Sequence, residues 1–149
     1  MLRPFWRLLL LIWIVTLLLG ISWPWSKFDG TPHWERVHWV PFQHVRLTPA
    51  LLSDFEFMAN IFVFVPLGFL IIRSFPPKSA GTWRALLPAL LVGGLCSFGL
   101  EIYQLFCHDR VPSVTDVINN VSGTVLGAGI ALWGGYLLHS SAVRLRRHS

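Results

Sequence analysis

The sequence predicts an all-α, polytopic membrane protein with four transmembrane helices and an interfacial loop after the first. Three observations predict it: the apolar composition, four long apolar stretches, and the concentration of charged residues between them. Of the 149 residues, 54% are hydrophobic and 13% are charged, about half the charged share of soluble domains. A soluble domain of this length leaves much of its surface in water. The composition therefore excludes a soluble enzyme and a disordered chain, and the length fits one domain, residues 1–149.

The predicted helices follow four long apolar stretches, because crossing a bilayer core of about 30 Å takes roughly 20 apolar residues. The four stretches cover residues 8–23, 57–72, 85–106 and 117–138. The second is short and ends before Pro76 and Pro77, because proline breaks helices. The third contains one acid, Glu101, and the fourth contains no charged residue.

The first stretch has a second interpretation, as a cleaved signal peptide, because two arginines precede it and small residues occur near its end. Its apolar run is long for a signal peptide, and Trp13 interrupts it. We therefore interpret it as a membrane anchor.

The longest loop, residues 24–56, mixes tryptophan and phenylalanine with acids and bases. This mixture is typical of the headgroup zone, where aromatic rings place an apolar body in lipid and a polar edge in water. Four prolines in the loop argue against one long helix. We expect interfacial turns, with one short helix near Trp34.

The basic residues predict the orientation, because Lys and Arg accumulate on the cytoplasmic side of a membrane. Eight of the twelve precede the first span, separate the second from the third, or follow the fourth: Arg3, Arg7, Arg73, Lys78, Arg84, Arg144, Arg146 and Arg147. The seven acids lie on or near the opposite face. We therefore expect both termini in the cytoplasm. We expect no nucleic-acid partner despite the net charge of +5, because these bases flank spans and would attract membrane lipids.

The third and fourth spans each carry a polar stripe. Gly94, Ser97, Glu101 and Gln104 fall within an arc of about 80°, and Asp116, Asn120, Gly123 and Gly127 fall within about 60°. Glycines four residues apart allow two helices to approach closely. We expect the two spans to form an antiparallel hairpin with their stripes facing each other and Arg110 at its tip.

An ionisable side chain within a span is costly and usually faces protein or water. The expected result of the hairpin is a polar pocket near the extracytoplasmic headgroups, and Asn60 at the start of the second span would complete its wall. The predicted ligand-binding residues are Asn60, Glu101, Gln104, Arg110, Asp116 and Asn120. No catalytic residue is assigned, and no cofactor is expected.

Several of these residues have structural interpretations as well. Ser113 and Asp116 match a capping box at a helix start. A buried ion pair between Glu101 and Arg110 would hold the hairpin together, and Asn120 could bridge helices as a structural hydrogen bond. The two glycines of the fourth span fit packing better than binding.

The histidines and cysteines suggest no metal site and no disulfide. His33, His38, His44 and His108 all lie on the outer side, but their spacing matches no zinc pattern, so we expect interfacial histidines and no bound metal. Cys96 and Cys107 are eleven residues apart on one predicted helix, about 16 Å. This separation is too long for a disulfide, so we interpret both as packing residues.

These residues together resemble a known family. The run NIFVFVPLGFL, residues 60–70, resembles the second helix of VanZ-like membrane proteins, and the positions from Glu101 to Gly127 reproduce the pattern E-x-x-Q, R, D-x-x-x-N-x-x-G-x-x-x-G. The resemblance covers residues 60–129, about half of the chain. It implies a four-helix protein of the bacterial cytoplasmic membrane. It also implies a link to glycopeptide resistance, notably to teicoplanin, with which the founding member is associated, and it implies no settled reaction.

Four functions compete at this stage. The first is a protein that binds an envelope lipid or a lipid-linked cell-wall precursor, with Arg110 meeting phosphate or carboxylate. The second is an intramembrane enzyme in which Glu101 and Asp116 divide acid and base work and Arg110 stabilises negative charge. The third is ion translocation through the Glu101 cluster, and the fourth is a membrane scaffold. The sequence leaves open the ligand, the presence of catalysis and the oligomeric state.

Overall fold

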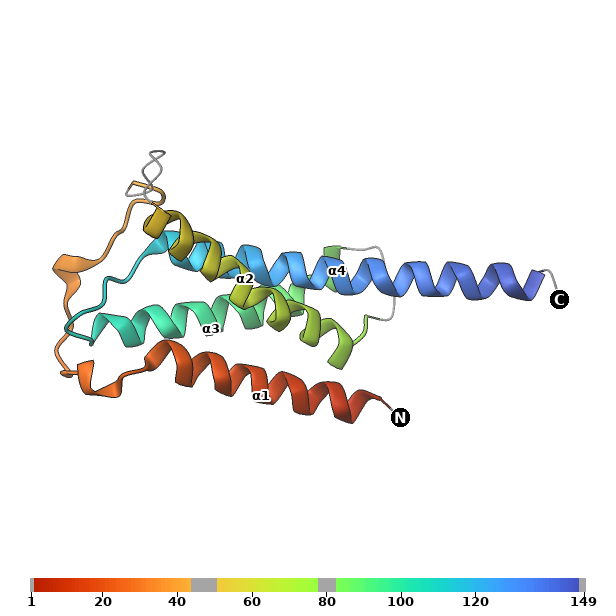
Figure 1. Cartoon of the computed structure of the whole chain (residues 1–149), viewed down its shortest axis with the longest axis horizontal. Coiled ribbons are helices and arrows are strands. Elements are labelled where there is room, and N and C mark those ends of the chain that lie inside the picture. Colours follow the sequence, from red (N-terminus) through yellow and green to blue (C-terminus); the bar gives the residue numbers. More distant parts are fainter. Residues whose placement is uncertain (1, 44–50, 78–82, 148–149) are drawn as a thin grey trace.

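The computed structural model describes residues 2–43, 51–77 and 83–147 (Figure 1). Four α-helices dominate it: α1 (Arg3–Ser22), α2 (Leu51–Ser74), α3 (Leu87–Leu105) and α4 (Val114–Arg147). Three 3₁₀ turns, Trp25–Lys27, Trp34–Arg36 and Trp83–Ala85, lie between them. Each α-helix contains a stretch long and apolar enough to cross a membrane. The described residues form no strand, so the predicted fold class is confirmed.

Three helices, α1, α2 and α4, are longer than the predicted stretches. Helix α2 begins at Leu51 and has 24 residues, with Pro66 inside it. A membrane helix tolerates an internal proline where neighbouring helices satisfy the freed backbone groups. Helix α4 has 34 residues, about 51 Å at 1.5 Å per residue. Its last turns therefore extend beyond the other three helices, at the end of the bundle that also holds the N-terminus (Figure 1).

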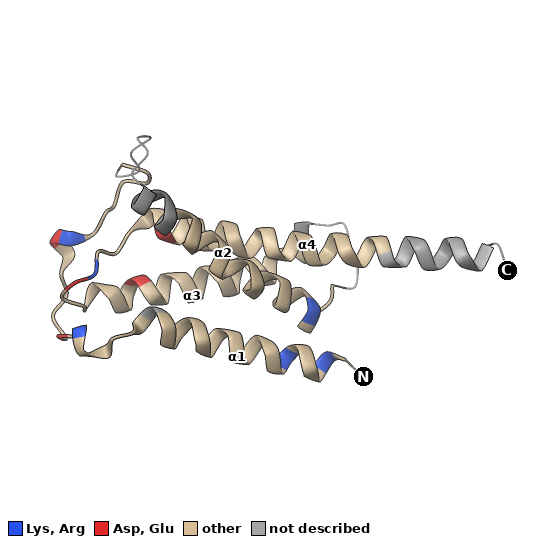
Figure 2. Ribbon diagram, in the orientation of Figure 1, with Lys and Arg blue, Asp and Glu red and all other residues tan. Residues whose placement is uncertain are grey.

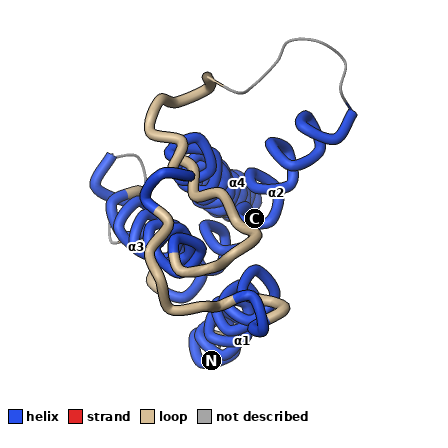
Figure 3. The backbone as a smooth tube through the Cα atoms, turned by 90° about the vertical axis from the view of Figure 1, so that its left-hand side faces the viewer, coloured by secondary structure: helices blue, strands red, loops and turns tan. Residues whose placement is uncertain are grey.

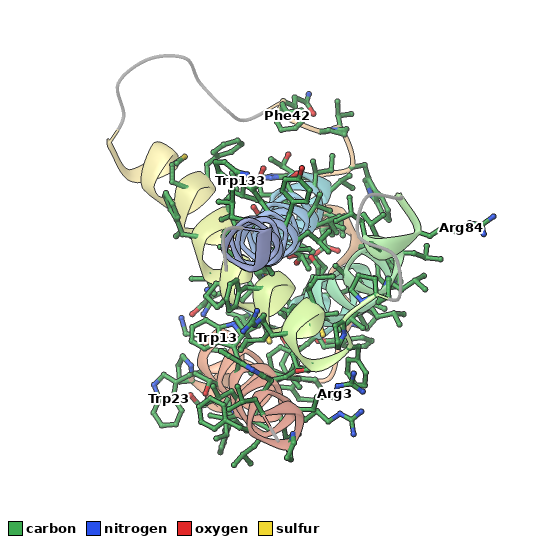
Figure 4. The ribbon with its side chains drawn as sticks, turned by 90° about the vertical axis from the view of Figure 1, so that its right-hand side faces the viewer. Arg3, Trp13, Trp23, Phe42, Arg84 and Trp133 are labelled. Carbon is green, nitrogen blue, oxygen red and sulfur yellow. The ribbon has the colours of Figure 1, made fainter. Side chains whose placement is uncertain are left out.

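The core of the bundle is built on α2, which packs along α4 more extensively than any other two helices do. Phe64, Leu67 and Ile71 of α2 are almost completely buried. The outward faces are apolar too: Figure 4 shows Trp23 and Trp133 pointing away from the bundle, where 65% and 68% of their surfaces are exposed. Large apolar side chains on the outside of a bundle suit a lipid surrounding.

The glycines of α4 contact a different helix from the one predicted. A Cβ atom at Gly123 or Gly127 would overlap the backbone carbonyl of Ile61 or Val65, both on α2. On α3 the close contact with α4 is made by Gly93, whereas Gly94 of the predicted stripe faces open space. The third and fourth spans do pack together, but the expectation that Gly123 and Gly127 face the third span is wrong. The spacing of small residues identifies a face of a helix but not the neighbour that covers it.

Two segments cross the ends of the helices opposite the termini, as Figure 3 shows. We call residues 23–43 and 106–113 the cover. Its two segments are joined by backbone hydrogen bonds of 2.9–3.1 Å, which run from Asp29, His33, His38, His108 and Val114 to carbonyls of the other segment or of the adjoining end of α3. The short helical element expected near Trp34 is present as the turn Trp34–Arg36.

The acids gather at one end of the bundle. Figure 2 shows the described acids toward the cover end, together with some Lys and Arg, whereas the terminal ends of α1 and α2 carry Arg without acids. Arg84 also lies at the terminal end, and its side chain projects away from the helices in Figure 4. His44 on the predicted outer side and Lys78 between the second and third spans lie outside the described residues.

Candidate functional site

A cavity of about 490 Å³ lies beneath the cover and receives residues from all four helices. The six residues predicted from the sequence all line it: Asn60, Glu101, Gln104, Arg110, Asp116 and Asn120. Gly20, Ala59, Leu100, Asp109 and Val111 complete the lining. This volume is within the usual range of about 300–1,000 Å³ for small-molecule pockets.

Glu101 lies on α3 with 8% of its surface exposed. Its Oε2 accepts a hydrogen bond of 2.7 Å from the backbone amide of Ser113, the residue before α4. The hydroxyl of Ser113 in turn accepts a hydrogen bond from the amide of Thr115, at 3.2 Å. Glu101 therefore fills the acidic half of a capping box from a neighbouring helix, near the positive end of the α4 dipole.

Two structural interpretations are changed by these contacts. In a capping box formed by Ser113 and Asp116, the carboxylate of Asp116 would accept a hydrogen bond from the backbone amide of Ser113. Glu101 accepts this hydrogen bond instead. The alternative of an ion pair between Glu101 and Arg110 is not realised among the described residues; Arg110 Nη2 donates instead to the carbonyl of Trp23, at 3.1 Å. Arg110 thereby joins the end of α1 to the connector between α3 and α4.

Asp116 and Asn60 connect α4 with α2 across the cavity. Asn60 Nδ2 donates a hydrogen bond of 2.7 Å to Asp116 Oδ1. A hydrogen bond to a carboxylate is stronger than one between two neutral groups, so this contact fixes both side chains. Asn60 thus supplies the wall from the second span that the sequence predicted.

Asn120 forms the deepest polar part of the lining, with 3% of its surface exposed. Its Nδ2 donates a hydrogen bond of 2.9 Å to Ser97 Oγ on α3, so the structural bridge between helices is present. Its Oδ1 is buried and has no hydrogen-bond partner among the described residues. A buried acceptor without a partner is costly, and here it belongs to a residue that lines the cavity.

The residues nearest the cover carry charges of both signs. Arg110 is half-buried, and its bond to Trp23 uses one of the five guanidinium donors. Asp109 forms an ion pair of 3.1 Å with Lys27, and the hydrogen bond and charge of Lys27 lower the pKa of Asp109 below its usual value. The cavity therefore combines one cation with several acceptors of hydrogen bonds.

The comparison with known families matches this architecture. A family model described as VanZ/LLP1 matches residues 6–138. The chain belongs to the VanZ/LLP1 family. The matched range extends well beyond the 60–129 region of the sequence resemblance and includes all the residues that line the cavity. No curated protein and no solved structure was found to match the chain.

The sequence of this VanZ/LLP1 protein did not reveal two groups of the site. The Ser113 amide and the Trp23 carbonyl bind Glu101 and Arg110, respectively. Both are backbone groups. Every residue has a backbone carbonyl, and every residue except proline has a backbone N–H, so neither group marks a position in the sequence. Only the position of Ser113 at the start of a helix signalled an amide without an intrahelical partner.

Proposed function

We propose that the cavity binds the polar headgroup of an envelope lipid or of a lipid-linked cell-wall precursor. The observation that carries the proposal is the gathering of Arg110 and six other polar residues, from three helices and the cover, around one cavity of about 490 Å³. A site with one cation and several fixed hydrogen-bonding groups suits a ligand that is anionic at one point and polar elsewhere.

Arg110 is the anion-binding group of this proposal. A guanidinium presents paired donors that match phosphate and carboxylate oxygens. Asn120 Oδ1, buried without a partner among the residues described, would accept a hydrogen bond from a hydroxyl or amide of the same ligand. Asn120 lies one helical turn below Asp116, farther from the cover. A ligand that contacts both Arg110 and Asn120 would therefore extend into the bundle.

The surroundings of the cavity support a lipid source. Trp23, Trp25, Trp34 and Trp39 of the cover are each more than half exposed, and exposed tryptophan is typical of the headgroup level of a bilayer. We propose that the cover faces the outside and that both termini lie in the cytoplasm, because Arg3, Arg7 and Arg73 lie at the terminal ends of α1 and α2, where Figure 2 shows bases and no acids. A bacterial cytoplasmic membrane fits this arrangement.

We favour binding over catalysis because both acids of the enzymatic alternative have other hydrogen-bonding roles. Glu101 holds the start of α4 through Ser113, and Asp116 holds Asn60. A general acid or base must exchange its proton with the substrate, whereas the contacts of both carboxylates described here serve the structure, through one oxygen each.

Mass spectrometry of lipids retained after gentle purification tests the proposal. The native chain should retain an anionic lipid, and Arg110→Ala should lose most of it. Arg36→Ala is the matched control, because it removes a cation of the cover that does not line the cavity and whose hydrogen bond goes to the carbonyl of His108, outside the lining. Equal retention by the native chain and Arg110→Ala, or equal loss in both variants, would contradict the proposal.

The link to teicoplanin is the physiological part of the same proposal. A protein that holds a cell-wall precursor would change its access to glycopeptides. Expression of the native chain in a susceptible bacterium should raise the inhibitory concentration of teicoplanin, and Arg110→Ala should not. If neither teicoplanin nor vancomycin changes in potency although the native chain inserts well, the resistance part is removed while headgroup binding can still be measured.

A further inference from the structure

Three side chains of types that can ligate a metal ion lie close together on the cover, outside the cavity. One ligand atom each of Asp29, His33 and His108 lies within 4.8 Å of the others. The histidine spacing predicted no zinc site, because the cluster draws residues from two segments that are more than seventy positions apart in the chain. Only the pairing of the two cover segments brings them together.

The distances within the cluster fit a small divalent cation. Zinc bonds of about 2.0–2.1 Å at a tetrahedral angle separate two ligand atoms by about 3.3 Å. Asp29 Oδ2 lies 2.8 Å from His33 Nε2 and 3.9 Å from His108 Nδ1. To reach this separation, the distance to His33 would lengthen and the distance to His108 would shorten, each by roughly half an ångström. Rotation of the side chains alone can supply this movement.

The backbone holds all three residues in place. The amide of Asp29 donates to the carbonyl of Phe106 at 3.0 Å, and the amide of His33 donates to that of Leu105 at 2.9 Å. The amide of His108 donates in the other direction, to the carbonyl of Lys27 at 2.9 Å. Each candidate ligand is therefore fixed across the junction between the two cover segments, so a metal would find them already positioned.

Neighbouring groups orient two of the ligands. Asp29 Oδ1 accepts hydrogen bonds of 2.9 Å from the amide and the hydroxyl of Thr31, which directs Oδ2 toward the histidines. Glu35 Oε1 lies 3.4 Å from His33 Nδ1, so a carboxylate faces the ring nitrogen opposite the one in the cluster. Carboxylates behind metal-bound histidines commonly fix the ring in this way.

A glycine permits the turn that brings Asp29 toward His33. Gly30 has φ of 76°, a left-handed conformation that side chains disfavour. The alternative of a simple pair between Asp29 and His33 accounts for their 2.8 Å contact. It does not account for His108, whose side chain is 68% exposed and yet has its Nδ1 turned to the same carboxylate oxygen.

We propose that Asp29, His33 and His108 bind a divalent transition-metal ion, with zinc as the expected species, which joins the two segments of the cover. Two histidines and one carboxylate are a common zinc ligand set, with water in the fourth position. The ion would stabilise the connector that carries Arg110, two residues after His108. The metal site is independent of the headgroup proposal, because metal binding is measured without any lipid ligand.

Titration of the purified full chain in detergent with Zn²⁺, against a chromophoric chelator, tests the proposal. One equivalent should bind, and His33→Gln, His108→Gln and Asp29→Asn should each weaken the affinity at least tenfold. His38→Gln is the matched control, because His38 lies on the same cover but outside the cluster. Binding of no zinc by the native chain, or equal affinity in the native chain and His108→Gln, would overturn the proposal.

The exposed His108 keeps the test clear of folding defects. Since most of its side chain is in contact with solvent, His108→Gln should leave the elution volume and helix content unchanged, so its loss of zinc would report ligation. Co²⁺ in place of Zn²⁺ supplies a second readout, since a tetrahedral N/O site gives visible absorption bands. Those bands should appear in the native chain and in His38→Gln and be absent in His108→Gln; bands of equal intensity in all three would contradict the assignment.

Discussion

Glu101 on α3 accepts a hydrogen bond of 2.7 Å from the backbone amide of Ser113, the residue that precedes α4. An acid within a membrane span is costly unless it has a partner, and this partner is the positive end of a helix. The contact joins α3 to the start of α4, and these two helices carry five of the eleven residues that line the cavity. It also explains why Glu101 can be buried without pairing with Arg110.

Two substitutions at Glu101 test how much its hydrogen bond to Ser113 stabilises the protein. Glu101→Gln keeps an oxygen acceptor, so the thermal midpoint in detergent should fall only slightly. Glu101→Leu leaves the Ser113 amide without its acceptor, which should cost about 1–3 kcal/mol. Unfolding monitored by size-exclusion fluorescence measures both. Equal midpoints for the two variants would show that the hydrogen bond to Ser113 contributes nothing.

The contact between Asn60 and Asp116 should appear as a coupling energy. Asn60→Ala, Asp116→Ala and the double variant form a thermodynamic cycle, and the coupling should be about 0.6–1.7 kcal/mol, the range measured between polar side chains in membrane proteins. Thr16→Ala combined with Asn60→Ala is the control, because Thr16 bonds only within its own helix and the two effects should add. Additive effects in the Asn60 and Asp116 cycle would refute the contact.

The glycines of α4 give a direct test of its packing on α2. Gly127→Ala places a Cβ against the Val65 carbonyl and should destabilise the protein by about 1–3 kcal/mol, as overpacking does. Gly129→Ala, on the same helix but facing open space, should leave the thermal midpoint unchanged or raise it slightly. Reversed effects would mean that α4 packs through its other face.

The four spans and the six polar residues could be predicted because their signals are local. A span needs only length and apolarity, and Glu101 stands out as a lone acid in such a stretch. Helical periodicity also placed Asp116 and Asn120 on one face. The cavity combines these local predictions: five of the predicted residues lie on helices, and Arg110 lies in the connector between α3 and α4.

Contacts between distant segments could not be predicted in the same way. Gly123 has the same spacing to Gly127 whichever helix covers it, so its contact with Ile61 of α2 required the tertiary fold. The same reasoning applies to His33 and His108, which backbone hydrogen bonds between the two cover segments bring together. A sequence pattern identifies a polar or a small face, whereas the partner of that face depends on the packing of the whole bundle.

The orientation is tested by labelling single cysteines in intact cells. In a background of Cys96→Ala and Cys107→Ala, Ser26→Cys on the cover should react with a membrane-impermeant maleimide, whereas Pro76→Cys at the opposite end should react only after lysis. Both positions are exposed, so burial does not separate them. Labelling of Pro76→Cys in intact cells, with Ser26→Cys protected, would invert the topology.

The proposed binding of a headgroup depends most on Arg110 as the anion-binding group of the cavity. Native mass spectrometry of the purified chain, titrated in detergent with a polyprenyl phosphate, measures that role directly. The native chain should bind one equivalent, and Arg110→Ala should bind at least tenfold more weakly, about 1.4 kcal/mol. Equal affinity of the native and variant chains, or equal binding of a polyprenol that lacks the phosphate, would contradict the account.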